Sequence, residues 1–194
     1  MAVLQALDVV GRRHHCIGES PSMRSKVASR PVLYRIWQFL QASLARVHPH
    51  ECILVEQLLS PVQAALFRQM ARSDQRHSLD VLYTLQKAGD PKAELIAAAL
   101  LHDVGKVGGQ LTIWHRVAVV LLQRFAPGRL ARLAANGKGW RAPFAVHVRH
   151  PQVGAQWAAD VGCSPETVDL IRRHHDTQPK DKPLVALQWA DRQN

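Results

Sequence analysis

Apolar residues recur at helical spacing along almost the whole chain from Pro31 onward. Spacings of three and four residues place side chains on one face of a helix, whereas strands need strict alternation. No segment shows strand-like alternation of useful length, and no internal repeat occurs. The pattern therefore predicts an all-α fold. Its first helical stretch carries Leu33, Ile36, Trp37, Leu40, Leu44 and Val47.

Capping residues, prolines and glycines divide this pattern into helices. Ser60-Pro61 and Ser164-Pro165 each combine an N-cap residue with a proline in the first helical turn. Asp74 is expected to cap the helix that runs through His77, and Gly105 to end the helix that follows. The expected helices cover 51–59, a stretch from 61, 74–88, 91–103, 111–125, 151–161, 165–175 and 183–192.

The domain organisation follows from where this pattern begins. Residues 1–30 are largely polar and basic and are predicted to form a flexible leader. Residues 31–194 are predicted to form one domain, a compact bundle of helices. Within it, 31–59 would be a helical extension and about 60–194 the core.

Composition narrows the choice of partners and compartment. Apolar residues make up 47% of the 194, and 25 Lys and Arg against 15 Asp and Glu give a net charge of +10. This charge favours phosphate esters, nucleic acid or acidic lipid, but no recognition motif predicts specific nucleic-acid binding. Three scattered cysteines without a CxxC pair, and no signal-peptide pattern, favour a reducing cytoplasm.

His102 and Asp103 stand side by side where a very apolar helix is expected to end, in LIAAALLHDVGK. Desolvating an unpaired carboxylate there would be expensive, and a bound cation would remove that cost. The negative end of the helix dipole also favours a cation. The pair is therefore the first candidate for a functional site.

Other histidines and one more aspartate also follow apolar helix faces. His77 is in register with Val81 and Leu85, and Asp191 follows Leu187. A single inward histidine is usually a hydrogen-bonded core residue, but a set in this order favours a site. Neutral imidazole and carboxylate together suit Zn²⁺, Fe²⁺, Mn²⁺ or Co²⁺. The remaining candidates are His150, expected at a helix start before Pro151, and the pair His174-His175.

These segments resemble the HD-domain superfamily of metal-dependent phosphohydrolases over about 60–194. The matching stretches, in order, are RHSLDVL, LLHDVGK, RHPQVGA, LIRRHHD and QWADRQ. The third and fourth resemble segments of binuclear HD enzymes. The Gly-Tyr-Pro loop of the cyclic di-GMP phosphodiesterases is missing, and small HD hydrolases of diadenosine tetraphosphate differ at the histidine pair.

The resemblance implies a pair of divalent ions, which could be Mn, Fe, Mg, Co or Zn. His77, His102, Asp103 and Asp191 would form the basic site, and Asp103 would bridge to a second ion. That second ion would be held by His150, His174 and His175. An activated hydroxide would then hydrolyse a phosphomonoester, phosphodiester or phosphoanhydride, with a nucleotide as the expected substrate. The expected catalytic residues are Asp103 and Lys106, and the expected substrate contacts are Lys106, Arg76, Arg149 and Arg173.

Two other interpretations stay open. The domain could be a non-catalytic module that binds a nucleotide or signal, although the near-complete ligand set argues against a degenerate site. The segment 111–133 could lie on an anionic membrane surface, but a helical hairpin on the core or at a homodimer interface is favoured over it.

Overall fold

The computed structural model describes residues 46–109, 113–135 and 137–194. The predicted leader and the part of the helical extension before residue 46 lie outside the described residues. Across the described ranges every regular element is helical, which confirms the all-α prediction. The elements are α2 (Pro49–Leu58), α3 (Pro61–Arg68), α4 (Arg72–Ala88), α5 (Ala93–Leu101), η1 (Val104–Lys106), α6 (Ile113–Phe125), α7 (Pro127–Ala135), η2 (Gly139–Arg141), α8 (Ala142–Asp160), α9 (Pro165–Arg173) and α10 (Lys182–Gln193).

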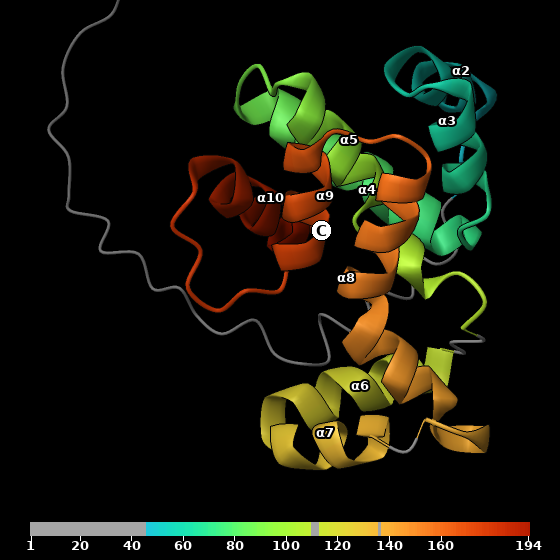
Figure 1. The fold of residues 1–194 in the computed structure, drawn as a ribbon, viewed down its shortest axis with the longest axis vertical. Coiled ribbons are helices and arrows are strands. Elements are labelled where there is room, and N and C mark those ends of the chain that lie inside the picture. Colours follow the sequence, from blue (N-terminus) through green and yellow to red (C-terminus); the bar gives the residue numbers. More distant parts are fainter. Residues whose placement is uncertain (1–45, 110–112, 136) are drawn as a thin grey trace, which may run out of the picture.

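The main core forms around α5, which packs against α4, α9 and α10 (Figure 1). The second half of α5, Ala98–Leu101, is fully buried, as expected of a helix that is apolar nearly all round. The side chains that close around it are also buried and come from helices distant in sequence. They include Leu79 and Leu82 on α4, Ile171 on α9, and Leu184 and Leu187 on α10.

Two of the three predicted N-cap residues cap their helices in the structure. Ser60 caps α3 and forms a capping box with Gln63, and Ser164 accepts the backbone N–H of Thr167 at the start of α9. The prediction that Asp74 caps α4 is wrong. Ala71 is the N-cap residue, and Asp74 lies buried in the first turn, where a carboxylate is stabilised by the positive end of the helix dipole.

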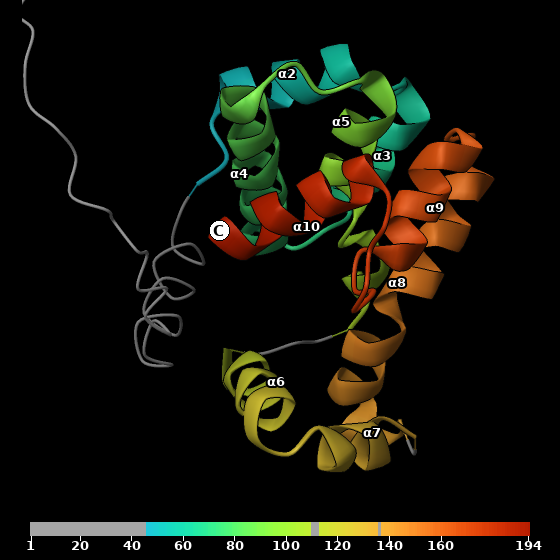
Figure 2. The ribbon, with the colours of Figure 1, turned by 90° about the vertical axis from the view of Figure 1, so that its left-hand side faces the viewer.

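Helices α6 and α7 form the predicted hairpin, and it packs on α8 (Figure 2). It lies at one end of the molecule, away from α2 and α3, and has a small core of its own. Val119, Leu130 and Phe144 are the buried members of that core. Among the described residues, no helix is both long and apolar enough to cross a membrane.

A buried ionic network ties α2 to α4. One Glu51 oxygen accepts the backbone N–H of His48 at 2.8 Å, and the other accepts Arg76 Nη1 at 2.6 Å and the Tyr83 hydroxyl at 3.0 Å. Burial raises the pKa of Glu51, but these hydrogen bonds outweigh it, and the net pKa is lowered. Arg76 also pairs with Asp80 at 2.9 Å. The network thus leaves each buried charge with a partner.

We expect Glu51→Ala to lower the free energy of unfolding by about 3 kcal/mol, because it leaves the buried Arg76 guanidinium short of a partner. Glu56→Ala is the matched control, since it breaks the exposed pair with Arg68, and should change stability by about 0.5 kcal/mol or less. Urea unfolding followed by circular dichroism measures both. Equal losses in the two variants would contradict the structural role of the Glu51 network.

Candidate metal centre

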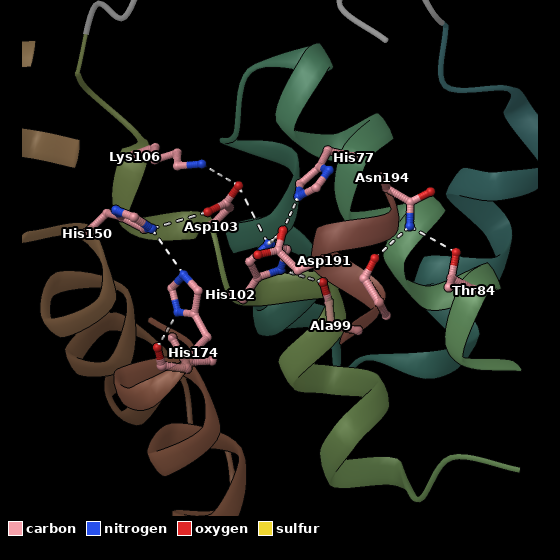
Figure 3. A network of polar contacts seen from close by, with 12 residues as sticks. His77, Thr84, Ala99, His102, Asp103, Lys106, His150, His174, Asp191 and Asn194 are labelled. Atoms are coloured by element: carbon pink, nitrogen blue, oxygen red, sulfur yellow. Dashed lines mark hydrogen bonds and ion pairs between the residues drawn. The ribbon is translucent and has the colours of Figure 1, made fainter. Parts of the chain in front are cut away.

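The predicted metal ligands come together where several helices end or cross (Figure 3). His102 and Asp103 follow the last turn of α5, and His174 and His175 follow α9. His150 enters from the middle of α8. The remaining two ligands are His77 on α4 and Asp191 on α10.

These side chains form two groups, each compact enough to hold one ion. His77, His102 and Asp191 offer ligand atoms that all lie within 4.8 Å of one another, and a second group does the same. That second group is His150, His174 and His175. The first mixes imidazole and carboxylate, and the second is imidazole alone.

Asp103 lies between the two groups and presents one oxygen to each. Its Oδ1 is 3.3 Å from His150 Nε2, and its Oδ2 is 3.6 Å from His102 Nε2. The carboxylate is almost fully buried. This placement is what a bridging ligand between two ions requires.

Backbone hydrogen bonds set the tautomers of the three buried histidines. The Nδ1–H groups of His102, His150 and His174 each donate to the carbonyl three residues earlier, at 2.9, 2.6 and 2.7 Å. A carbonyl can only accept, so Nδ1 must carry the proton. In the neutral ring Nε2 then keeps a lone pair for a metal, and the ring orientation is held.

The carbonyl that orients His150 is free because of a proline. Pro151 lies inside α8, so the expectation that it opens a helix, with His150 at the start, is wrong. Proline has no N–H, and the carbonyl four residues earlier, on His147, therefore loses its helical partner. The His150 imidazole takes that place, which satisfies the carbonyl within an unbroken helix.

The distance between two ligand nitrogens fits a shared cation. His150 Nε2 and His174 Nε2 are 3.2 Å apart, and both rings are buried. With both Nδ1 atoms protonated, two neutral rings would direct lone pairs at each other. Two nitrogens each about 2.1 Å from one ion would lie this far apart at an angle of about 100°. The donor set therefore fits a divalent ion, which would remove the repulsion.

Most of the histidines and both carboxylates are held in the protonation states that a metal needs. Burial lowers the pKa of His174 and of His102, and it lowers the pKa of His175 to about 4. Burial would raise the pKa of Asp103, but Lys106 and His102 lower it well below its usual range. The site therefore favours neutral imidazole and ionised carboxylate.

His77 and Asp191 form a pair of their own. His77 Nε2 lies 2.9 Å from Asp191 Oδ1. Burial lowers the pKa of His77, but the Asp191 hydrogen bond and the charge of Asp103 raise it above the ordinary value. The pKa of Asp191 is lowered in return. Burial alone would raise this pKa, but the hydrogen bond from His77 and the nearby His102 lower it by more.

The predicted substrate contacts divide into two groups. Lys106 Nζ lies 2.5 Å from Asp103 Oδ2 at the edge of the site, and Arg149 is exposed beside His150 on α8. Arg76 is engaged by Glu51 and Asp80 inside the fold. Arg173 is engaged by three carboxylates, those of Asp169, Asp176 and Asp181, at 2.9, 3.0 and 2.9 Å. These ion pairs argue against substrate contacts by Arg76 and Arg173.

Two glycines let η1 lie directly against α8, and reasoning from the sequence missed this role. A Cβ on Gly105 would be 2.1 Å from the His150 carbonyl oxygen and 2.7 Å from Gly154 N. Gly105 does not stop α5 as predicted, since α5 ends at Leu101 and Gly105 lies within η1. The contact holds Asp103 beside His150. The sequence signal for this close contact was a glycine in each of the two motifs, VGK and PQVGA.

Comparison with known proteins gives one match. The sequence model of the family described as HD domain matches residues 75–193. This range contains all seven predicted metal ligands. No curated protein and no solved structure matches the chain.

We expect Gly105→Ala to lower the free energy of unfolding by about 3 kcal/mol, because the new methyl group would force η1 away from the α8 backbone. Metal uptake should fall with it, since Asp103 precedes η1. Gly89→Ala is the control: a Cβ there meets nothing within 4 Å, and stability should change by about 0.5 kcal/mol or less. Urea unfolding and equilibrium dialysis with Mn²⁺ measure the two effects. Full Mn²⁺ uptake by a stable Gly105→Ala protein would contradict this account of the contact.

Proposed function

The chain belongs to the HD-domain family, whose members are generally metal-dependent hydrolases, and from that premise we propose that it hydrolyses a phosphoester or phosphoanhydride at a two-metal site. One observation carries the proposal. The two ligand groups are joined by Asp103, which directs a separate oxygen toward each. A family fold alone would not require this arrangement.

The residues divide naturally between two ions. His77, His102 and Asp191 would hold one, His150, His174 and His175 the other, and Asp103 would contribute to both. Divalent ions at such a site would lower the pKa of a bound water and neutralise charge on the phosphate oxygens. The hydrogen bonds from Nδ1 of His102, His150 and His174 to carbonyls keep Nε2 aimed inward throughout.

Lys106 is the protein's own cation at this site. Its ammonium contacts Asp103, so it lies next to the carboxylate that both ions would share. It is partly exposed, and a phosphate oxygen approaching Asp103 would meet it. We propose that Lys106 stabilises charge on the phosphate as the bond to the leaving group breaks.

The proposed substrate is a small phosphorylated molecule, with a nucleotide as the leading candidate. The net charge of +10 favours an anion, and Arg149 stays a proposed contact because it is exposed beside His150. The alternative, a module that binds a nucleotide or signal without turnover, would not need all seven ligands. The homodimer stays a prediction.

We expect Asp103→Asn to reduce metal-dependent hydrolysis by at least about a thousandfold, because the amide cannot supply two anionic oxygens to two ions. Hydrolysis of bis-p-nitrophenyl phosphate with added Mn²⁺ measures turnover, and mass spectrometry of the metal content measures loading. His77→Gln and His174→Gln should each lower the ion count by removing a ligand from a different group.

His50→Gln is the matched control, since His50 is exposed and stacks on His48 away from the site. Its turnover and metal content should equal those of the unmodified protein. Metal-dependent turnover that persists in pure Asp103→Asn protein would overturn the proposal. Full metal loading without turnover on any phosphoester or nucleotide would favour the binding module instead.

We expect Lys106→Gln to keep its metals but lower kcat by about a hundredfold or more, the loss typical of removing one charge-stabilising group. The metals should stay bound because Lys106 contacts the proposed ligand Asp103 and is not itself a ligand. Steady-state kinetics and metal analysis of the same preparation separate the two effects. An unchanged kcat with raised KM would limit Lys106 to substrate binding.

A further inference from the structure

One long part of the chain contains basic residues but no acidic ones. Residues 104–159 contain eight Lys or Arg and no Asp or Glu, although the whole chain has 15 acidic residues. This segment comprises η1, the α6–α7 hairpin and nearly all of α8. Six of the eight cations fall between positions 113 and 141. This stretch includes α6, α7 and η2, and the α6–α7 hairpin lies at one end of the molecule (Figure 2).

Some cations of the main core are paired with carboxylates. In the core, Arg68, Arg76 and Arg173 each contact one or more carboxylates. Within the part of the chain that the structure describes, no carboxylate pairs with the cations of the hairpin end. The cations described there are Arg124, Arg129, Arg132, Lys138 and Arg141.

Large apolar side chains are exposed among these cations. Leu121 and Phe125 are four residues apart on one face of α6, and Phe125 is 68% exposed. Trp140 follows the hairpin and is 65% exposed. The guanidinium groups of Arg124 and Arg141 lie over the Phe125 and Trp140 rings, at 5.6 and 5.0 Å from their centroids.

The exposed side chains belong to a part of the fold that has a small hydrophobic core of its own. The inner face of α6 supplies Val119 to the small cluster with Leu130 and Phe144, and Trp140 contacts the edge of the Phe144 ring. Leu121 and Phe125 are therefore not needed to hold the hairpin together. Exposed aromatic and aliphatic side chains surrounded by arginines are typical of helices that lie in the interface of an anionic bilayer.

We propose that the end formed by α6, α7 and η2 docks on the surface of an anionic membrane. Phe125, Leu121 and Trp140 enter the boundary between headgroups and acyl chains, and the unpaired arginines and Lys138 contact the lipid phosphates. Nucleic acid shares the phosphate chemistry, but stacking of bases does not use an aliphatic side chain such as Leu121. The membrane accounts for both the charge and the apolar groups. The proposal does not depend on the proposed hydrolysis.

Flotation of the full chain with lipid vesicles tests the proposal. The protein should float with phosphatidylcholine vesicles that contain phosphatidylglycerol, and it should stay in solution with phosphatidylcholine alone. The double variant Phe125→Ser, Trp140→Ser should bind at least about tenfold more weakly, because burial of the two rings is lost. Each neutralised cation, as in Arg132→Gln, should weaken binding by about fivefold at low salt.

The matched control is Ile53→Ser, Trp189→Ser, which removes two exposed apolar side chains from α2 and α10, outside the hairpin end. It should float like the unmodified protein, and circular dichroism should show the same helicity and melting midpoint for both double variants. Failure of the unmodified protein to float with anionic vesicles would overturn the proposal. So would equal losses in the two double variants, or binding to an oligonucleotide but not to vesicles.

Discussion

The candidate metal centre buries imidazole nitrogens beside the Asp103 carboxylate, and two of these nitrogens cannot satisfy each other. His150 Nε2 and His174 Nε2 face each other at 3.2 Å while both Nδ1 atoms are committed to backbone carbonyls. Asp103 lies in contact with this group, and an ionised carboxylate is expensive to desolvate. A divalent cation bound here would remove the repulsion between the two nitrogens and the cost of burying the carboxylate, so the ligand positions fit a metal centre.

Helix geometry supplies the groups that hold these rings. The last carbonyls of a helix have no partner within it, and at the ends of α5 and α9 the imidazoles of His102 and His174 take up the carbonyls of Ala99 and Ile171. At His150 no helix ends, and Pro151 creates the equivalent free carbonyl on His147. Three different places in the fold thus use one local interaction to orient a ligand.

Charge is distributed unevenly between the two ends of the molecule. In the main core, buried or clustered charges have partners, as in the Glu51–Arg76 pair and the Arg173 cluster. At the hairpin end, an acid-free segment leaves cations without carboxylates beside exposed rings. Helix α8 packs against the hairpin and also carries His150, so one helix connects the two regions.

The sequence predicted the helical periodicity and the caps at Ser60 and Ser164, because these depend on neighbours within a few residues. It also predicted the candidate ligands, from their places on apolar helix faces and from the resemblance of five separated motifs. The tertiary structure decided the rest. It showed that Pro151 lies within α8, that Gly105 is required for contact with α8, and that Arg76 and Arg173 are engaged by carboxylates. It also brought the two groups of ligands that the resemblance implies together, on either side of Asp103. These outcomes depend on which distant segments meet, and no local spacing determines that.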